Sequence, residues 1–244
     1  MCDHCLFSEP DPGTRRSFLK KVAATAAFAG LSGVTRAAAK ADAPQAGHTG
    51  WARLVTPSPY WDIHNGHDPI MGDFIRRETT LKLDPVYYPV EPAKLDRLCA
   101  FPFIFTNNLA VVRNERELLN IREYLYRGGF IYIDGCVNAQ VTPSFKVFYE
   151  QHMALFQRLL PGCEIRKLQS NHPIFRAYFP VNEHDLNTYF VGDRVPALYG
   201  VIDDDRMIML LSLEALQCGW PQDPEKMKVD MKQIANIYVY ALAH

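Results

Sequence analysis

The pattern of hydrophobic and polar residues is clearest over residues 101–136, where it predicts a strand, a helix and a second strand. Residues 101–106 are almost all apolar, as in a strand that is buried on both faces. Residues 130–133 are apolar again and lead into a polar turn. Between the two runs, apolar residues recur at helical spacing, at Leu118, Ile121 and Leu125. The stretch therefore predicts a βαβ unit near the centre of a sheet.

Both ends of this helix carry recognisable signals. Asn114 is a favourable N-cap, and Glu117 follows it at the spacing of a capping box. Gly128 and Gly129 end the helix, because glycine adopts the left-handed C-terminal conformation without a Cβ clash.

Further strands and helices alternate along the chain. The predicted strands are residues 51–56, 81–90, 101–106, 130–133, 163–168, 198–202 and 207–213. The predicted helices are residues 69–79, 91–98, 114–127 and 144–160, and a last helix that opens at Asp223 and Pro224. This alternation predicts a three-layer α/β fold, with a mainly parallel sheet between helices. The hairpin around Asp203-Asp204-Asp205 predicts one antiparallel edge pairing.

Composition and charge narrow the class of protein. The chain has 244 residues, of which 48% are hydrophobic and 22% charged, as expected for one globular domain with an appendage. The formal net charge of −1 argues against nucleic acid as a partner, because such proteins usually carry a basic field.

The appendage is an N-terminal leader. Residues 14–20 (TRRSFLK) match a twin-arginine export signal, a mild apolar segment follows, and Ala37-Ala38-Ala39 offers a cleavage site. The segment is too short and too weakly apolar for a stable transmembrane span. We therefore expect a periplasmic protein that meets the twin-arginine translocase during export. The predicted divisions are the leader 1–39, the linker 40–50 and a single α/β domain 51–244.

Four cysteines lie beyond the leader: Cys99, Cys136, Cys163 and Cys218. In an oxidising compartment they allow up to two disulfides in three possible pairings. Their wide spacing along the chain matches no zinc-binding pattern.

Polar side chains follow several predicted strands. In an open α/β sheet, ligands bind beyond the carboxyl ends of the strands, so these side chains are candidate ligand-binding residues. They are Trp61, Asp62, Asn107, Asn108, Asp134, Cys136 and Glu214. The cofactor is unknown, since the sequence contains no phosphate loop and no dinucleotide fingerprint.

A candidate metal site is formed by His64, His67 and Asp68. Their i, i+3, i+4 spacing would place three ligand-type side chains on one face of a helical turn, which suits zinc or iron. Against this, Asn65-Gly66 interrupts a helix. In the alternative interpretation, Asp68 caps the following helix and the histidines hydrogen-bond to backbone.

Two other residues invite a chemical interpretation. Cys136 follows a strand, where a nucleophile would stand, but no elbow glycine follows it and no partner base is evident, which favours a packed or disulfide-bonded cysteine. His152 lies on the apolar face of its helix, which favours a core histidine with satisfied hydrogen bonds.

An ordered set of segments resembles the family of the domain of unknown function 4159. The segments are Phe105–Asn108, Tyr124–Asp134, Asn171–Phe175, Tyr199–Asp204 and Asn236–Ala241. The resemblance implies a fold of the class I glutamine-amidotransferase-like, flavodoxin-related type. It implies no established activity and no catalytic residues. The chain departs from the family pattern at Gln217-Cys218-Gly219-Trp220, which replaces a more acidic, glycine-rich loop.

The sequence thus favours a periplasmic, non-catalytic α/β protein that binds a ligand or an envelope protein partner at the carboxyl edge of its sheet. One alternative is a metal-assisted hydrolase that uses His64, His67 and Asp68, with Asp134. Another is a subunit of an exported redox or envelope assembly, in which the cysteines are structural.

Overall fold

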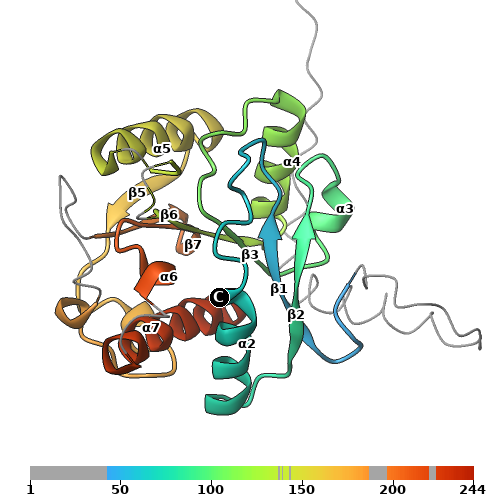
Figure 1. Ribbon diagram of the computed structural model, residues 1–244. Coiled ribbons are helices and arrows are strands. Elements are labelled where there is room, and N and C mark those ends of the chain that lie inside the picture. The colour runs from blue at the N-terminus through green and yellow to red at the C-terminus, as the bar shows by residue number, and fades with distance from the viewer. Residues whose placement is uncertain (1–42, 137, 139, 143, 187–196, 220–223) are drawn as a thin grey trace, which may run out of the picture.

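The computed structural model describes residues 43–136, 138, 140–142, 144–186, 197–219 and 224–244. The predicted leader, 1–39, lies outside the described residues. A single sheet runs through the described domain, with helices packed on both of its faces (Figure 1).

The elements follow one another in the predicted order. The strands are β1 (Thr49–Leu54), β2 (Leu83–Val90), β3 (Phe103–Thr106), β4 (Phe130–Asp134), β5 (Glu164–Lys167), β6 (Leu198–Asp203) and β7 (Arg206–Ser212). The helices are α2 (His67–Glu78), α3 (Leu95–Leu98), α4 (Glu115–Tyr126), α5 (Phe145–Leu159), α6 (Leu216–Gly219) and α7 (Pro224–Ala243), with short 3-10 turns η2 (Pro173–Phe175) and η3 (Glu183–Asp185).

The seven strands lie in the order β2-β1-β3-β4-β7-β6-β5. The first five are parallel, β6 runs antiparallel to β7, and β5 runs antiparallel to β6. Numbered along the chain, the five parallel strands have the 2-1-3-4-5 order of flavodoxin-like sheets. The prediction of a mainly parallel, three-layer fold with an antiparallel edge hairpin is confirmed, and β4 occupies the centre.

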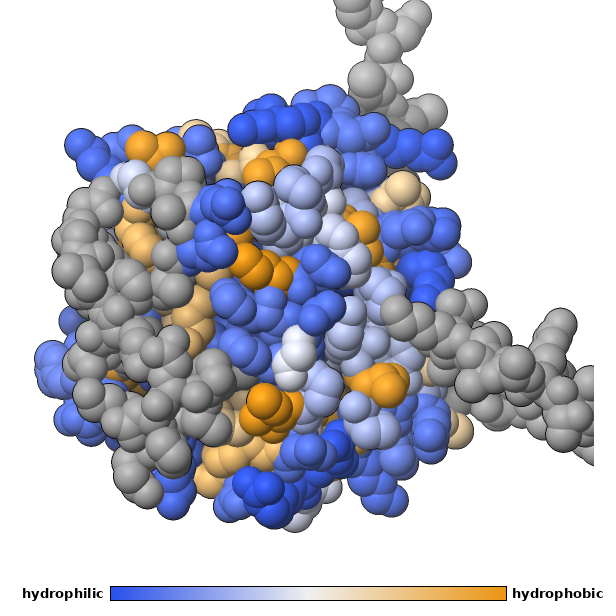
Figure 2. Space-filling view, in the orientation of Figure 1, coloured by the Kyte–Doolittle hydropathy of each residue, from blue (hydrophilic) through white to orange (hydrophobic). Residues whose placement is uncertain are grey.

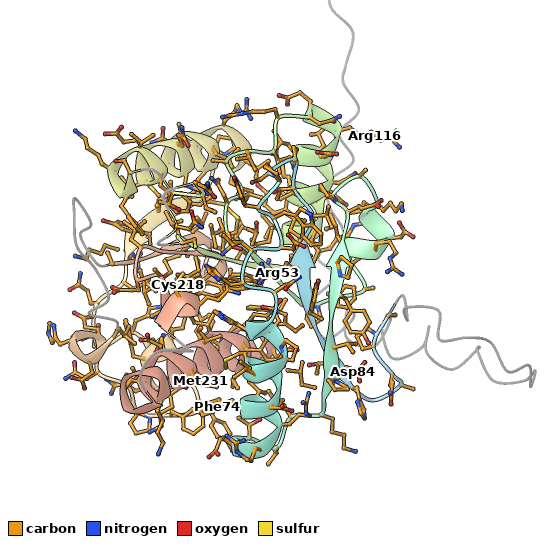
Figure 3. The ribbon with its side chains drawn as sticks, in the orientation of Figure 1. Arg53, Phe74, Asp84, Arg116, Cys218 and Met231 are labelled. Atoms are coloured by element: carbon orange, nitrogen blue, oxygen red, sulfur yellow. The ribbon has the colours of Figure 1, made fainter. Side chains whose placement is uncertain are left out.

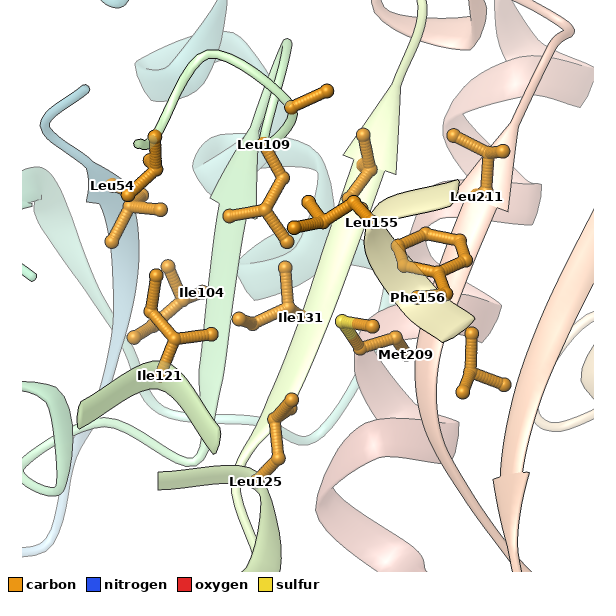
Figure 4. Close-up of a cluster of buried hydrophobic side chains, with 14 of the residues drawn as sticks. Leu54, Ile104, Leu109, Ile121, Leu125, Ile131, Leu155, Phe156, Met209 and Leu211 are labelled. Atoms are coloured by element: carbon orange, nitrogen blue, oxygen red, sulfur yellow. The ribbon is translucent and has the colours of Figure 1, made fainter. Parts of the chain in front are cut away.

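Side chains from alternate strand positions build two hydrophobic layers. Ile104 and Ile131 face the layer formed with α3, α4 and α5, part of which Figure 4 shows. Phe103 and Phe105 face the opposite layer, formed with α2 and α7. Because the central strands are buried on both faces, their sequences are almost continuously apolar, as in the run predicted at 101–106.

The predicted ends of the central helix are confirmed. The Asn114 side chain accepts hydrogen bonds from the backbone N–H groups of Arg116 and Glu117 at the start of α4. At its end, Gly128 has a φ of 100°, a conformation that favours glycine. A Cβ at Gly129 would overlap the ring of Tyr124, so this position also requires glycine.

Two predictions at the start of the domain were wrong in detail. Asp68 does not cap α2, which begins at His67 after Gly66, because the Asp68 carboxylate turns inward to Arg53 instead. The first strand lies two residues earlier than predicted, at Thr49–Leu54, because its pairing with β2 starts at Thr49.

The surface in the view of Figure 2 is largely hydrophilic, and its hydrophobic residues form small separate groups. Among the described residues, no helix combines the length and apolar character needed to cross a bilayer.

His152, on α5, is fully buried, and both nitrogens of its ring make hydrogen bonds. Its Nε2 accepts from the Leu109 backbone N–H (3.2 Å), and its Nδ1–H donates to the Phe148 carbonyl (2.8 Å). The predicted core histidine is therefore confirmed. Burial lowers the pKa of His152 to about 4, because the charged ring would lie in an apolar layer.

We predict that His152 makes the domain less stable in mild acid. Between pH 6.5 and about 4 the unfolded chain binds a proton that the folded chain excludes, so the stability present above pH 6.5 falls as the pH drops. A shift of this size corresponds to roughly 3 kcal/mol. Urea unfolding from pH 7.5 to 4 should show a shallower decline for His152→Gln than for the wild type. His184→Gln, which changes an exposed histidine, should keep the wild-type slope. Parallel slopes for all three proteins would contradict the prediction.

Candidate functional site at the carboxyl edge of the sheet

The carboxyl ends of the parallel strands β1, β3, β4 and β7 meet at one edge of the sheet. β1 and β3 are neighbours, yet the chain leaves β1 for α2 on one face and leaves β3 for α4 on the other (Figure 1). Such a switch point opens a crevice, where ligands bind in open α/β sheets. Any site at this edge therefore lies between the segments that follow these strands.

Arg53, labelled in Figure 3, lies near the end of β1 and ties these segments together. Its buried guanidinium donates two parallel hydrogen bonds to the Asp68 carboxylate, from Nε to Oδ2 (2.9 Å) and from Nη2 to Oδ1 (2.8 Å). Its Nη1 donates to Asn107 Oδ1 (3.0 Å) and to the backbone carbonyls of Trp61 (3.2 Å) and Ile63 (3.0 Å). Bidentate, charge-assisted pairs of this kind are stronger than hydrogen bonds between neutral groups.

Gln217, on α6, closes these contacts into a ring. Its Nε2 donates to Asp68 Oδ1 (3.2 Å), and its Oε1 accepts from Asn107 Nδ2 (3.0 Å). Its backbone N–H donates to Asp134 Oδ2 (2.8 Å) at the end of β4. The ring of Arg53, Asp68, Gln217 and Asn107 is buried and joins the segments after β1, β3 and β7, with β4 attached through Asp134.

Burial shifts the acid–base chemistry of the carboxylates in this network. It raises the pKa of Asp134 to about 6, while the hydrogen bond from the Gln217 backbone works in the opposite direction. Burial also raises the pKa of Asp68, and the Arg53 guanidinium opposes that rise.

Two cysteine thiols and an imidazole meet beside the network. The Sγ atoms of Cys136 and Cys218 are 3.5 Å apart, and neither cysteine is in a disulfide. The hydrogen bond with Cys218 lowers the pKa of the Cys136 thiol, with His64 acting in the same direction and burial opposing both.

The structure places the seven predicted ligand-binding residues at this edge, in two levels. Trp61, Asp62 and Asn108 are half-buried at the rim. Beneath them lie four buried residues: Asn107, Asp134, Cys136 and Glu214.

Among the described residues, the three predicted metal ligands do not form a common group of ligand atoms. The rings of His64 and His67 stack at 5.1 Å between centroids. The Asp68 carboxylate instead faces Arg53 and Gln217, and both of its oxygens accept hydrogen bonds. Among the described residues, the His64 ring comes within metal-ligand range of Cys136 and Cys218.

Arg53 and Gln217, which organise the site, were not among the residues predicted from the sequence. A signal for Arg53 exists in Trp51-Ala52-Arg53-Leu54, where one charge interrupts an apolar strand. A charge in such a strand requires a buried partner. Gln217 gave no comparable signal, because its partners lie more than 80 residues away in the chain.

We predict that Arg53→Met strongly destabilises the domain, because it leaves the Asp68 carboxylate buried without its cation. Breaking a buried pair in this way costs about 3–5 kcal/mol. Adding Asp68→Asn should recover part of the loss, since the uncompensated charge is removed. Urea unfolding measures both effects.

The matched control is Arg127→Met, which breaks the solvent-exposed pair with Glu123. It should cost less than about 1 kcal/mol. An equal, small loss for Arg53→Met, or no recovery in the double variant, would show that the Arg53 network does not hold the edge together.

Comparison with protein-family models agrees with the family resemblance found in the sequence. No curated protein matches the chain. The family model described as "Domain of unknown function (DUF4159)" matches residues 51–242, which include every described helix and strand except the first two residues of β1 and the last residue of α7. The chain therefore belongs to the DUF4159 family.

Proposed function

We propose that this protein is an exported α/β domain that binds a small polar ligand at the carboxyl edge of its sheet without transforming it. The observation that carries the proposal is the buried ring of Arg53, Asp68, Gln217 and Asn107. The ring holds three segments that lie far apart in the sequence. This gives the edge the rigidity that a preformed binding site needs.

The rim supplies the groups for recognition. Asp62 and Asn108 offer a carboxylate and an amide, and the Trp61 indole offers an apolar ring with one N–H donor. All three are half-buried. Together they suit a ligand with hydrogen-bonding groups and a flat or apolar face. An envelope protein that inserts such a group is the alternative occupant.

Hydrolysis by His64, His67 and Asp68 is the weaker candidate. A general base or metal ligand must reach the substrate or the ion, whereas the Asp68 carboxylate is buried and both of its oxygens accept hydrogen bonds from Arg53 and Gln217. Asp68 is therefore better explained as a residue that positions the loop carrying His64.

Two surface hollows elsewhere are the competing sites for a small ligand. One has a volume of about 500 Å³ and lies between α5 and β5–β6, where Tyr149, Met153 and Tyr199 line it. The other, of about 390 Å³, lies between α2 and α7, where Figure 3 shows Phe74 and Met231.

Crystallographic screening with a fragment library tests the position of the site. We expect polar, ring-containing fragments to bind repeatedly between Trp61, Asp62 and Asn108, because this edge combines half-buried hydrogen-bonding groups with a base held by the buried ring. The double variant Asp62→Ala/Asn108→Ala should lose them.

Asp205→Ala is the matched control, because Asp205 is an exposed aspartate in the β6–β7 turn, at the opposite edge of the sheet. It should bind the same fragments as the wild type. Fragments that collect in the α5 or α2–α7 hollows, or that ignore the Asp62→Ala/Asn108→Ala change, would refute the proposed site.

Export is the second part of the proposal. It is supported by the twin arginines Arg15 and Arg16 and by the start of the family match at residue 51, after the predicted leader and linker. The twin-arginine route carries proteins that are already folded, which suits a domain whose site depends on a buried network.

We predict that Arg15→Lys/Arg16→Lys retains the protein in the cytoplasm, because the translocase requires the arginine pair. Cell fractionation and immunoblotting of the full chain measure the distribution. Arg36→Lys, near the other end of the leader, should be exported normally. Equal periplasmic recovery of the arginine-pair variant would exclude this export route.

A further inference from the structure

Three metal-ligating side chains converge at the carboxyl edge from segments far apart in the sequence. His64 comes from the loop after β1, Cys136 follows β4, and Cys218 lies on α6 after β7. One donor atom from each lies within 4.8 Å of the other two. Both cysteines are buried and His64 is half-buried. Three donors at this separation can share a single ion.

The distance between the two sulfurs agrees with shared coordination. In tetrahedral zinc sites the Zn–S bond is about 2.3 Å, which places two thiolate sulfurs about 3.8 Å apart. Cys136 and Cys218 have their sulfurs at 3.5 Å, whereas a disulfide requires about 2.05 Å. Two thiols in simple contact would have a similar spacing, so the third donor decides between the interpretations.

The imidazole of His64 is that third donor, and its backbone supports a functional role. His64 has a φ of 58°, in the left-handed region of backbone conformation that residues other than glycine rarely adopt. Its Nε2 is buried and has no hydrogen-bond partner among the described residues. A buried nitrogen without a partner is costly, and a bound cation would remove that cost.

Neighbouring groups contact the donor atoms and hold them in place. The backbone N–H of Asn138 donates to the Cys136 sulfur at 3.4 Å. The His67 ring stacks against His64, and its Nδ1 lies 3.3 Å from the Gln217 carbonyl. These contacts fix the orientation of both the sulfur and the ring.

The donor chemistry selects the class of ion. Two thiolates and one imidazole suit a borderline-soft cation such as Zn²⁺, whereas Mg²⁺ and Ca²⁺ prefer oxygen ligands. Zinc sites with three protein ligands keep a fourth position for water or for another ligand. Two thiolates would also balance the charge of a divalent ion in this buried setting.

We propose that His64, Cys136 and Cys218 bind a thiophilic divalent cation, preferentially Zn²⁺, and leave one coordination position facing the edge of the sheet. This metal site rests on the proposed function, because the ion would be held at the same edge of the sheet where we propose that the ligand binds. Of the two histidines predicted as metal ligands from the sequence, His64 coordinates the ion, and His67 stacks against His64 and holds its ring in place.

Cobalt titration of the reduced, metal-free protein tests the site. Co²⁺ should produce a near-ultraviolet thiolate-to-cobalt charge-transfer band and the visible bands of a tetrahedral ion, and one equivalent of Zn²⁺ should abolish them. Cys136→Ser, Cys218→Ser and His64→Gln should each weaken Zn²⁺ binding by about a hundredfold or more, as measured by competition with a chromophoric chelator.

Cys99→Ser and Cys163→Ser are the matched controls, because both cysteines lie outside the cluster. They should keep the cobalt bands and the wild-type affinity. Circular dichroism and urea unfolding of each variant establish that a loss of binding does not reflect a loss of fold.

The absence of cobalt bands in the reduced wild type would overturn the metal site. So would bands that survive Cys136→Ser and Cys218→Ser, or a metal-free Cys136–Cys218 disulfide in protein recovered from the periplasm. If fragments still bind at Asp62 and Asn108 in that case, only the metal site fails. If neither cobalt nor fragments bind at this edge, the proposed function fails with it.

Discussion

The carboxyl edge of this domain depends on the burial of one arginine. Arg53 stands in a strand that is otherwise apolar, so its charge needs a complete set of partners in a low-dielectric setting. Those partners are the carboxylate of Asp68, the amide of Asn107 and two carbonyls of the loop after β1, and Gln217 completes the ring. Removing the side chain of Asp68, Asn107 or Gln217 leaves a buried polar group unsatisfied. The network therefore acts as a unit that holds loops in place.

This constraint links the scaffold to the chemistry above it. The loop after β1 is held at its carbonyls by Arg53 and at its end by Asp68, and it carries His64 between these two points. The α6 segment is held by Gln217 and carries Cys218 as the next residue. Two of the three donors are thus adjacent to, or enclosed by, residues of the buried ring, and the third, Cys136, follows Asp134 by two positions. A rigid base of this kind keeps donor atoms at fixed separations.

The same geometry separates structural residues from recognition residues. Asn107 and Asp134 lie in the network and beneath the surface, so their hydrogen bonds are engaged in support. Trp61, Asp62 and Asn108 stand at the rim, where a ligand can reach them. Gln217 and Cys218 are neighbours in the chain: Gln217 completes the buried ring, and Cys218 contributes a thiol beside Cys136.

Most of the fold follows from local patterns in the sequence. The period of the apolar residues, the Asn114 cap and the glycines at 128–129 act within a few residues of one another, so local rules sufficed for the βαβ unit and for the alternation that implies a parallel sheet. The sequence also indicated the edge where polar residues gather. How these residues pair depends on the three-dimensional fold, because partners such as Arg53 and Asn107 are brought together by strand order, which spacing along the chain does not encode. The cysteines illustrate the same limit: Cys136 and Cys218 are 82 residues apart, and their closeness follows from the pairing of β4 with β7.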